Sequence, residues 1–136
     1  MSQYSLLSIP PYQFLLPLHA LKEVRPTPLI NPVPKAPPYV LGLFPIRGEL
    51  CTLLCLPTLL NFAKEPSSFT KAIILDHDIG LFALEVVDAD IISFLEEPKP
   101  APLNLSFSDW VAGMFSASNE DFFILDFAPL QDIVAP

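Results

Sequence analysis

The sequence is short of positive charge, and this shortage excludes two classes of partner. It has seven Lys and Arg against fifteen Asp and Glu, which gives a formal net charge of −8 at pH 7. Proteins that bind nucleic acid or anionic lipid need clustered cations to meet the phosphates. We therefore expect neither partner, and the remaining expectation is that the chain binds other proteins.

Glycine, cysteine and histidine are also scarce. The chain has only four glycines: Gly42, Gly48, Gly80 and Gly113. They are too scattered to cradle a phosphate, and no P-loop, dinucleotide-binding or calcium-loop motif is present. Cys51 and Cys55 lie four residues apart, but only His19 and His77 remain to complete a metal site, and their spacing does not suit one. The sequence predicts two buried free thiols, no disulfide, no metal and no cofactor.

One acidic and histidine-containing stretch, Asp76–His77–Asp78, has residue types suited to acid–base chemistry. Carboxylates on both sides of a histidine would raise its pKa. Neighbouring side chains on a turn point apart, however, and the sequence has no serine elbow or activated cysteine to complete a triad. We therefore predict that the protein is not an enzyme.

Long apolar runs are also missing, although 51% of the residues are hydrophobic. The best candidate for a membrane span, Leu50–Ala63, is uncharged over only 14 residues and contains Pro57. A span needs roughly 20 apolar residues. The N-terminus lacks the basic segment and the cleavage site of a signal peptide. We expect a cytoplasmic protein with an unusually apolar core.

Proline is the residue in excess. Seventeen prolines in 136 residues are more than twice the usual share of about 5%. Proline interrupts helices and central strands, so this composition favours many short strands joined by stiff turns. Two proline-rich stretches, Arg25–Pro38 and Glu96–Pro102, are predicted to be extended segments that cross the surface.

An internal repeat organises the chain. Tyr39–Leu60 aligns without gaps on Trp110–Gln131 at an offset of 71 residues. The matched pairs are Val40 and Val111, Gly42 and Gly113, Phe44 and Phe115, Glu49 and Glu120, Leu54 and Leu125, and Leu59 and Leu130. We therefore expect one domain made of two related halves, about residues 1–66 and 67–136. Halves of this length cannot easily bury their own apolar faces alone.

Hydrophobic alternation and turn residues place the elements. The expected strands are Tyr4–Ile9, Tyr12–Pro17, Val40–Phe44, Leu50–Leu54, Ala72–Asp76, Leu105–Met114 and Phe122–Phe127. The expected short helical pieces are Leu18–Val24, Leu56–Phe62 and Pro129–Val134. Apolar residues in Ile79–Leu95 also have helical spacing, but their β-branched side chains favour two strands with a turn near Asp88–Asp90. Short strands at this spacing are typical of small barrels.

The turn at Arg47–Gly48 is the candidate functional feature. Arg47 is the only cation between Lys35 and Lys64, and the second copy of the repeat has Ser118–Asn119 in this place. A duplication that keeps the strands but changes the turn suggests a common scaffold with function on one side. The alternative is that Arg47 is a solvated turn residue without a function.

These residues resemble a known family. Ala36–Gly48, APPYVLGLFPIRG, is similar to the signature P-x-x-[VI]-x-G-[VL]-x-x-x-R-G of CheW-like domains, the adaptor modules of bacterial chemotaxis. The resemblance extends over nearly the whole chain: Gln13–Val24 resembles the opening strand of the family, Ala72–Asp76 its middle strand, and Phe122–Leu130 its closing segment. Where family members usually have a proline and then an aspartate after the turn, this chain has Thr52 and Cys55.

The resemblance implies a mostly β fold of two SH3-like five-stranded barrels, related by a pseudo-two-fold axis, with an apolar seam between them. It also implies a scaffold that links a chemoreceptor's cytoplasmic tip to the regulatory domain of a CheA-type histidine kinase. The implied protein-binding residues are Arg47, Gly48, Val40 and Gly42, with Arg47 exposed beside the groove between the barrels. The alternative is a divergent CheW-like regulator that binds a single partner in a pilus-motility or light-response pathway.

Overall fold

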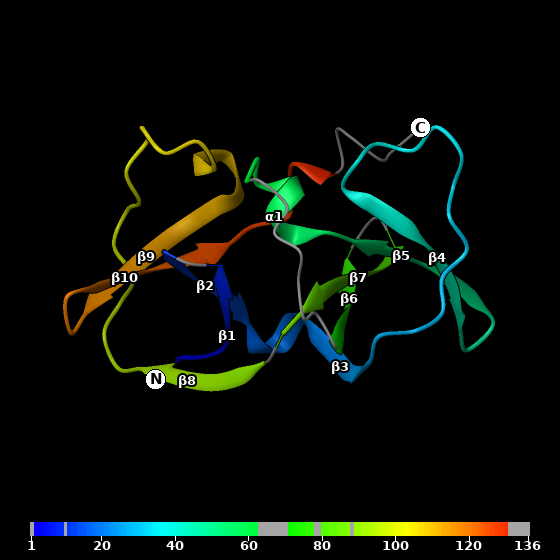
Figure 1. The fold of residues 1–136 in the computed structure, drawn as a ribbon. Coiled ribbons are helices and arrows are strands. Elements are labelled where there is room, and N and C mark those ends of the chain that lie inside the picture. The colour runs from blue at the N-terminus through cyan, green and yellow to red at the C-terminus, as the bar shows by residue number, and fades with distance from the viewer. Residues whose placement is uncertain (1, 10, 63–70, 78–79, 88, 131–136) are drawn as a thin grey trace. The chain divides into compact units, whose positions relative to one another are not determined.

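The computed structural model describes residues 2–9, 11–62, 71–77, 80–87 and 89–130. Short strands dominate these residues, as expected from the proline content (Figure 1). The strands are β1 Ser2–Ile9, β2 Tyr12–Pro17, β3 Leu21–Pro26, β4 Val40–Ile46, β5 Glu49–Leu54, β6 Lys71–His77, β7 Gly80–Val86, β8 Asp90–Phe94, β9 Val111–Ala117 and β10 Glu120–Leu125. The helical pieces are η1 Leu18–Ala20, α1 Leu56–Leu59 and η2 Ser108–Trp110.

The chain forms two compact units that interleave along the sequence. The first unit contains Met1–Leu18 and Asp90–Pro136, and the second contains His19–Ala89. The boundary near residue 66 that the repeat suggests therefore does not separate the units. The reason is strand pairing: β2 pairs in parallel with β10, so the N-terminal hairpin completes the sheet of the C-terminal repeat copy.

Each unit has one five-stranded sheet, and the two sheets have the same strand order. The first sheet runs β8-β1-β2-β10-β9 and the second β3-β6-β7-β5-β4. In each sheet two antiparallel hairpins meet through one parallel pair, β2 with β10 or β7 with β5. The edge strand that completes each sheet, β8 or β3, pairs antiparallel with the outer strand of one hairpin. This common topology confirms that the sequence repeat reflects a duplicated fold.

The repeat extends to an irregularity in the strand pairing. In β4 the register skips one residue between Val40 and Gly42, and in β9 it skips one residue between Val111 and Gly113. These bulges lie at equivalent positions of the repeat. A β-bulge bends its strand and increases the local twist. The two copies therefore share the bend as well as the strand order.

The proline-rich segments cross the bulged strands, as predicted. Asn31 exchanges two backbone hydrogen bonds with Leu43, at 2.8 and 2.9 Å, and Lys99 does the same with Met114, at 2.9 and 2.8 Å. The repeated glycines make room for these crossings. A Cβ on Gly42 would lie 2.8 Å from the carbonyl oxygen of Asn31, and one on Gly113 would lie 3.3 Å from that of Lys99.

The two expected five-stranded β subdomains are present, but the described strands do not close either one into a barrel. Among the described residues no strand ladder joins the two edges of either sheet, and each crossing forms only one isolated bridge. Prolines explain the interruption, because they lack the N–H that a continuous ladder requires. Arg25–Pro38 and Glu96–Pro102 are both rich in proline, so each sheet stays open and a crossing segment covers one edge.

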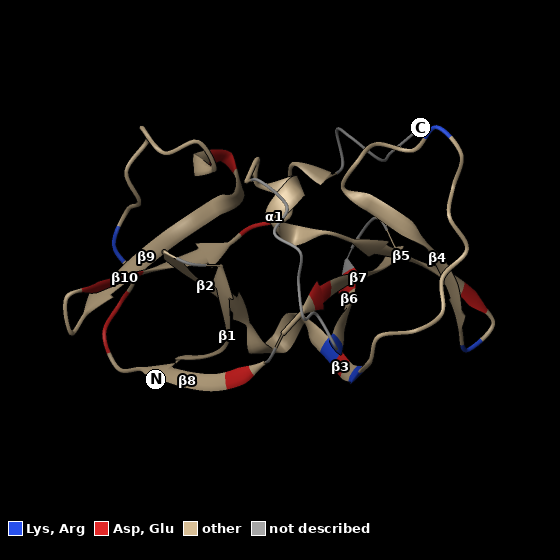
Figure 2. Cartoon of the chain, viewed as in Figure 1, with Lys and Arg blue, Asp and Glu red and all other residues tan. Residues whose placement is uncertain are grey.

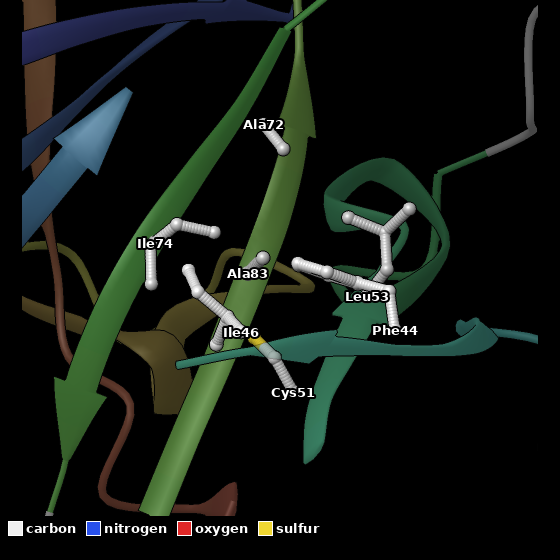
Figure 3. Packing of buried hydrophobic residues seen from close by; sticks show 7 residues of the cluster. All are labelled: Phe44, Ile46, Cys51, Leu53, Ala72, Ile74 and Ala83. Carbon is white, nitrogen blue, oxygen red and sulfur yellow. The ribbon is translucent and has the colours of Figure 1, made fainter. Parts of the chain in front are cut away.

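Each unit has its own core. The second unit packs Phe44, Ile46, Cys51, Leu53, Ala72, Ile74 and Ala83 between its strands (Figure 3). The first unit packs Tyr4, Leu15, Phe94, Phe115, Phe122 and Ile124. In this aromatic cluster the rings of Phe94 and Phe115 stack at 4.1 Å between centroids. Offset or stacked aromatic pairs add stability beyond the area they bury.

Most expected elements are present, including the two strands β7 and β8 predicted within Ile79–Leu95. Several predictions were wrong in extent. The helix expected over Leu56–Phe62 ends at Leu59, and the strand expected over Phe122–Phe127 ends at Leu125. Leu18–Val24 is helical only at η1, since its remainder pairs with β6 as strand β3. The strand expected over Leu105–Met114 starts at Val111, because the preceding residues form turns and η2.

Ser108 stabilises these turns before β9: its hydroxyl accepts a hydrogen bond from the Leu105 N–H at 3.1 Å and lies 3.0 Å from the carbonyl oxygen of Pro102. Other expected features fall on residues that the structure does not describe. They are Asp78 of the acid–base stretch, Asp88 of the turn before β8, and most of the helix expected over Pro129–Val134.

Candidate protein-binding site

The candidate site is the tip of the β4–β5 hairpin. Arg47 and Gly48 form a two-residue turn in which both φ angles are positive, 47° and 80°. The equivalent turn, Ser118–Asn119, has φ angles of 52° and 64°. Positive φ at both central residues is typical of type I′ turns, whose twist matches that of the flanking strands. The strands therefore impose the turn, and the side chain at position 47 is free to differ.

Arg47 projects into solvent and forms an ion pair with an edge strand. Its side chain is 71% exposed, and its Nη2 lies 2.7 Å from Oε1 of Glu23 in β3. The contact is an ion pair without the geometry of a hydrogen bond, since Glu23 Oε1 is buried and no donor among the described residues is aligned with it. β3 and β4 are the two edges of one sheet. The ion pair therefore bridges the open side of the second unit.

An apolar surface adjoins this charge. Pro45 and Leu50 face each other across the β4–β5 ladder next to the turn, and both are exposed. Leu50 keeps 66% of its surface accessible. Arginine is one of the residue types enriched among the energetically important residues of protein interfaces. Figure 2 shows that charged ribbon elsewhere in the second unit is confined to a few stretches, among them β3.

The structure separates the four predicted site residues into two groups. Arg47 and Gly48 are exposed at the turn, whereas Val40 is half-buried and Gly42 is buried at the opposite end of β4. Arg47 follows Val40 by seven positions, which corresponds to about 23 Å along an extended strand. Gly42 admits the Asn31 backbone and does not face solvent.

Glu23 is the residue that sequence reasoning missed. It lies 24 positions before Arg47 in a segment predicted to be helical, so no spacing rule connects the two. β3 also carries Lys22, whose Nζ lies 3.5 Å from Oδ2 of Asp76 in a pair that is exposed on both sides. Asp76 of the acid–base stretch therefore interacts with a lysine, and the structure does not describe its neighbour Asp78.

The cysteines match the expected buried free thiols. Burial raises the pKa of Cys51 to about 11, and the nearby Arg25 partly opposes this effect. A thiol with a raised pKa is a poor nucleophile and metal ligand. Cys55 accepts a hydrogen bond from the hydroxyl of Thr58 at 3.2 Å. Within the part of the chain that the structure describes, no three His, Cys, Asp or Glu side chains cluster as metal ligands.

The described residues contain no helix that is long and apolar enough to span a bilayer.

Comparison with known proteins places this geometry in a family. The sequence profile described as "CheW-like domain" matches residues 3–133. No curated protein sequence matches the chain. Among solved structures, the chain is similar to the scaffolding protein TtCheW from Thermoanaerobacter tengcongensis, with a TM-score of 0.87 and 18% sequence identity. That alignment covers 99% of this chain and 90% of the other. At this identity the likeness establishes the fold.

Proposed function

Because the chain belongs to the CheW-like domain family, we propose that it is a non-catalytic adaptor of chemotaxis-type signalling. It links the cytoplasmic tip of a chemoreceptor to the regulatory domain of a CheA-type histidine kinase, and it works in the cytoplasm at receptor arrays. The observation that carries the proposal is the extent of the family match, residues 3–133. This range includes strands of both units, so the adaptor function belongs to the whole chain.

The Arg47 turn supports the proposal and supplies its docking residue. The two hairpin turns share a backbone conformation, but only one presents a guanidinium, which is 71% exposed. Because the duplicated fold does not require an arginine at this turn, the Arg47 side chain is available to bind a partner protein. Arginine suits this role because its planar fork can bind a partner's carboxylate through two hydrogen bonds. Gly48 leaves space beside it, with no atom near the position that a Cβ would occupy.

The test is reconstitution of a ternary complex. The purified chain is mixed with a receptor cytoplasmic fragment and a kinase regulatory domain encoded by neighbouring genes, and complexes are separated by size-exclusion chromatography. We expect all three proteins to elute together. The Arg47→Ser variant should lose at least about fivefold in receptor affinity, as expected for an interface arginine worth more than about 1 kcal/mol. Serine already occupies the equivalent position, Ser118, in a turn of the same geometry.

The matched control is Lys35→Ser. Lys35 is an exposed cation in the same unit, with a positive φ of 63°, so the control removes the same charge from a similar backbone conformation. Its affinity for the receptor fragment should stay within about twofold of the wild-type value, as for a residue outside an interface. If both variants lost the same amount of receptor affinity, the effect of Arg47 would be one of net charge and not of a specific contact. Co-elution with only one partner would favour the single-partner regulator.

A further inference from the structure

The first unit contains a hollow that the adaptor proposal does not use. It has a volume of about 330 Å³ and lies where the β1–β2 and β9–β10 turns meet. Tyr12, Phe123 and Leu105 form its apolar walls, and Glu120 and Asp121 lie on its rim. All these residues belong to the first unit. Asp121 lies on the same face of β10 as Phe123, whereas the side chain of Glu120 lies on the opposite face, the face of the core residue Phe122. The hollow thus combines aromatic side chains with one carboxylate, that of Asp121.

We propose that this hollow binds an arginine side chain presented by a partner protein. A guanidinium has a flat, weakly hydrated face that stacks on aromatic rings and a fork of donors that pairs with carboxylates. The Asp121 carboxylate supplies the negative charge, and Tyr12 supplies the ring. The net charge of −8 adds long-range attraction for a basic segment.

The rim carboxylate is held in position by its own hairpin. Ser116 and Asp121 are partners across the β9–β10 ladder, and the Ser116 hydroxyl donates a hydrogen bond to Asp121 Oδ1 at 2.7 Å. Ring packing holds the aromatic wall in position. The Tyr12 ring packs edge-to-face on Phe107 at 5.0 Å, and Phe107 in turn packs edge-to-face on Phe123 at 5.3 Å. Pre-positioned groups reduce the entropy that binding must overcome.

The second unit shows that the fold itself does not require these side chains. The strand registers show which positions of the two sheets are equivalent. Ile9 pairs with Tyr12 in the first sheet and His77 with Gly80 in the second, so Tyr12 is equivalent to Gly80. In the parallel pairs Phe123 pairs with Phe14 and Thr52 with Phe82, so Phe123 is equivalent to Thr52. The repeat matches Asp121 to Leu50. At the equivalent positions the second unit thus has a glycine in place of Tyr12, a threonine in place of Phe123 and a leucine in place of Asp121.

The test uses a peptide probe and no other protein. The ¹⁵N-labelled chain is titrated at low salt with acetyl-Gly-Arg-Gly-amide, and amide shifts are followed by NMR. We expect the shifts to cluster at Tyr12, Gln13, Asn119, Glu120 and Asp121. The double variant Glu120→Gln, Asp121→Asn should bind about tenfold more weakly, since it loses both rim charges. Both residues are exposed, and the dispersion of the amide spectrum checks that the variant is folded.

The matched control is Glu49→Gln, which removes the equivalent carboxylate of the second unit and should leave binding unchanged. Raising the salt concentration should weaken the wild-type response. Shifts spread evenly over all acidic surfaces, an undiminished response in the double variant, or equal binding of acetyl-Gly-Lys-Gly-amide would each overturn the assignment. The experiment involves neither Arg47 nor a receptor, so its failure would leave the adaptor proposal unaffected.

Discussion

Arg47 is held at its position by the backbone of the hairpin more than by its ion pair with Glu23. The side chain of Arg47 is 71% exposed and that of Glu23 is 29% exposed. Solvent at the guanidinium screens the pair, and ion pairs at the surface contribute about 0–1 kcal/mol. We therefore expect Arg47→Ser to change the free energy of unfolding, measured by urea titration, by less than about 1 kcal/mol. A loss of more than about 2 kcal/mol would make Arg47 a structural residue.

Gly42 is the opposite case, a residue of the signature whose role is packing. A Cβ at this position would lie 2.8 Å from the backbone oxygen of Asn31, and that carbonyl is tied to Leu43 by a hydrogen bond. We expect Gly42→Ala to lower the free energy of unfolding by about 2–3 kcal/mol, as for other overpacked sites. Gly113→Ala is the matched variant. The corresponding distance there is 3.3 Å, so its cost should be smaller, and the reverse order would contradict this explanation.

Cys51 makes stability depend on pH in the alkaline range. Its thiol has an ordinary pKa of 9.0, and burial raises the pKa to about 11 in the folded protein. Between these two values the unfolded chain has lost this proton and the folded chain keeps it, so stability falls as pH rises. The full interval corresponds to a loss of at most about 3 kcal/mol.

The measurement compares urea midpoints of the wild type and Cys51→Ala, in reducing buffer, at pH 8 and pH 10.5. Lysine and tyrosine also titrate in this range, so the difference between the two proteins isolates the thiol. The wild type should lose more stability than the variant. Parallel pH profiles would show that Cys51 does not stay protonated in the folded state.

At the scale of elements, the two proline-rich crossings determine how each sheet ends. They cover the edge strands β4 and β9 through paired hydrogen bonds at Leu43 and Met114. Unpaired edges are sites of unwanted strand addition, and proteins often protect them with a covering segment. Proline suits such a segment, because it restricts the chain to extended conformations before folding and so lowers the entropic cost of docking.

Hydrogen exchange tests whether the crossings stay in place. The amides of Leu43 and Met114 donate to the crossing segments, at 2.9 and 2.8 Å. Both should exchange slowly despite lying on edge strands, because exchange requires local opening. The Asn31→Pro variant removes the donor that binds Leu43 and should accelerate exchange at Leu43 while leaving Met114 unchanged. Fast exchange at both positions in the wild type would mean that the segments are detached in solution.

For the whole molecule, the important feature is the exchange of hairpins between the repeats. The β1–β2 hairpin pairs with β10 and also supplies, through β1, the partner of β8. A chain without residues 1–18 keeps every strand of the second sheet, but in the first sheet β8 loses its pairing with β1. We expect that chain to retain the second unit and to lose the first.

Trp110 provides the readout. It is the single tryptophan, lies in the first unit and is only 8% exposed. In the shortened chain its fluorescence should shift to the red, as for a solvated indole, and a synthetic peptide of residues 1–18 should restore the original emission. An unchanged spectrum without the peptide would show that residues 90–136 fold without the N-terminal hairpin.

Much of the fold was accessible from local patterns. Proline excess, alternation and β-branched residues predicted short strands, and they resolved Ile79–Leu95 correctly as two strands because side-chain stiffness depends only on the residue itself. The β3 segment was missed for a physical reason. Its strand conformation depends on pairing with β6, a partner some fifty residues away, and local propensity cannot register such a pairing.

The sequence by itself determined the duplicated strand pattern, the family and the arginine turn, since each depends on residue types at short, fixed spacing. Only the tertiary structure decided which hairpin completes which sheet, that Gly42 is a packing residue, and that Glu23 meets Arg47. Tyr12 and Asp121 likewise come together only in the folded first unit. These contacts join residues that are distant in sequence, and their energies arise only after the chain has closed the intervening loops.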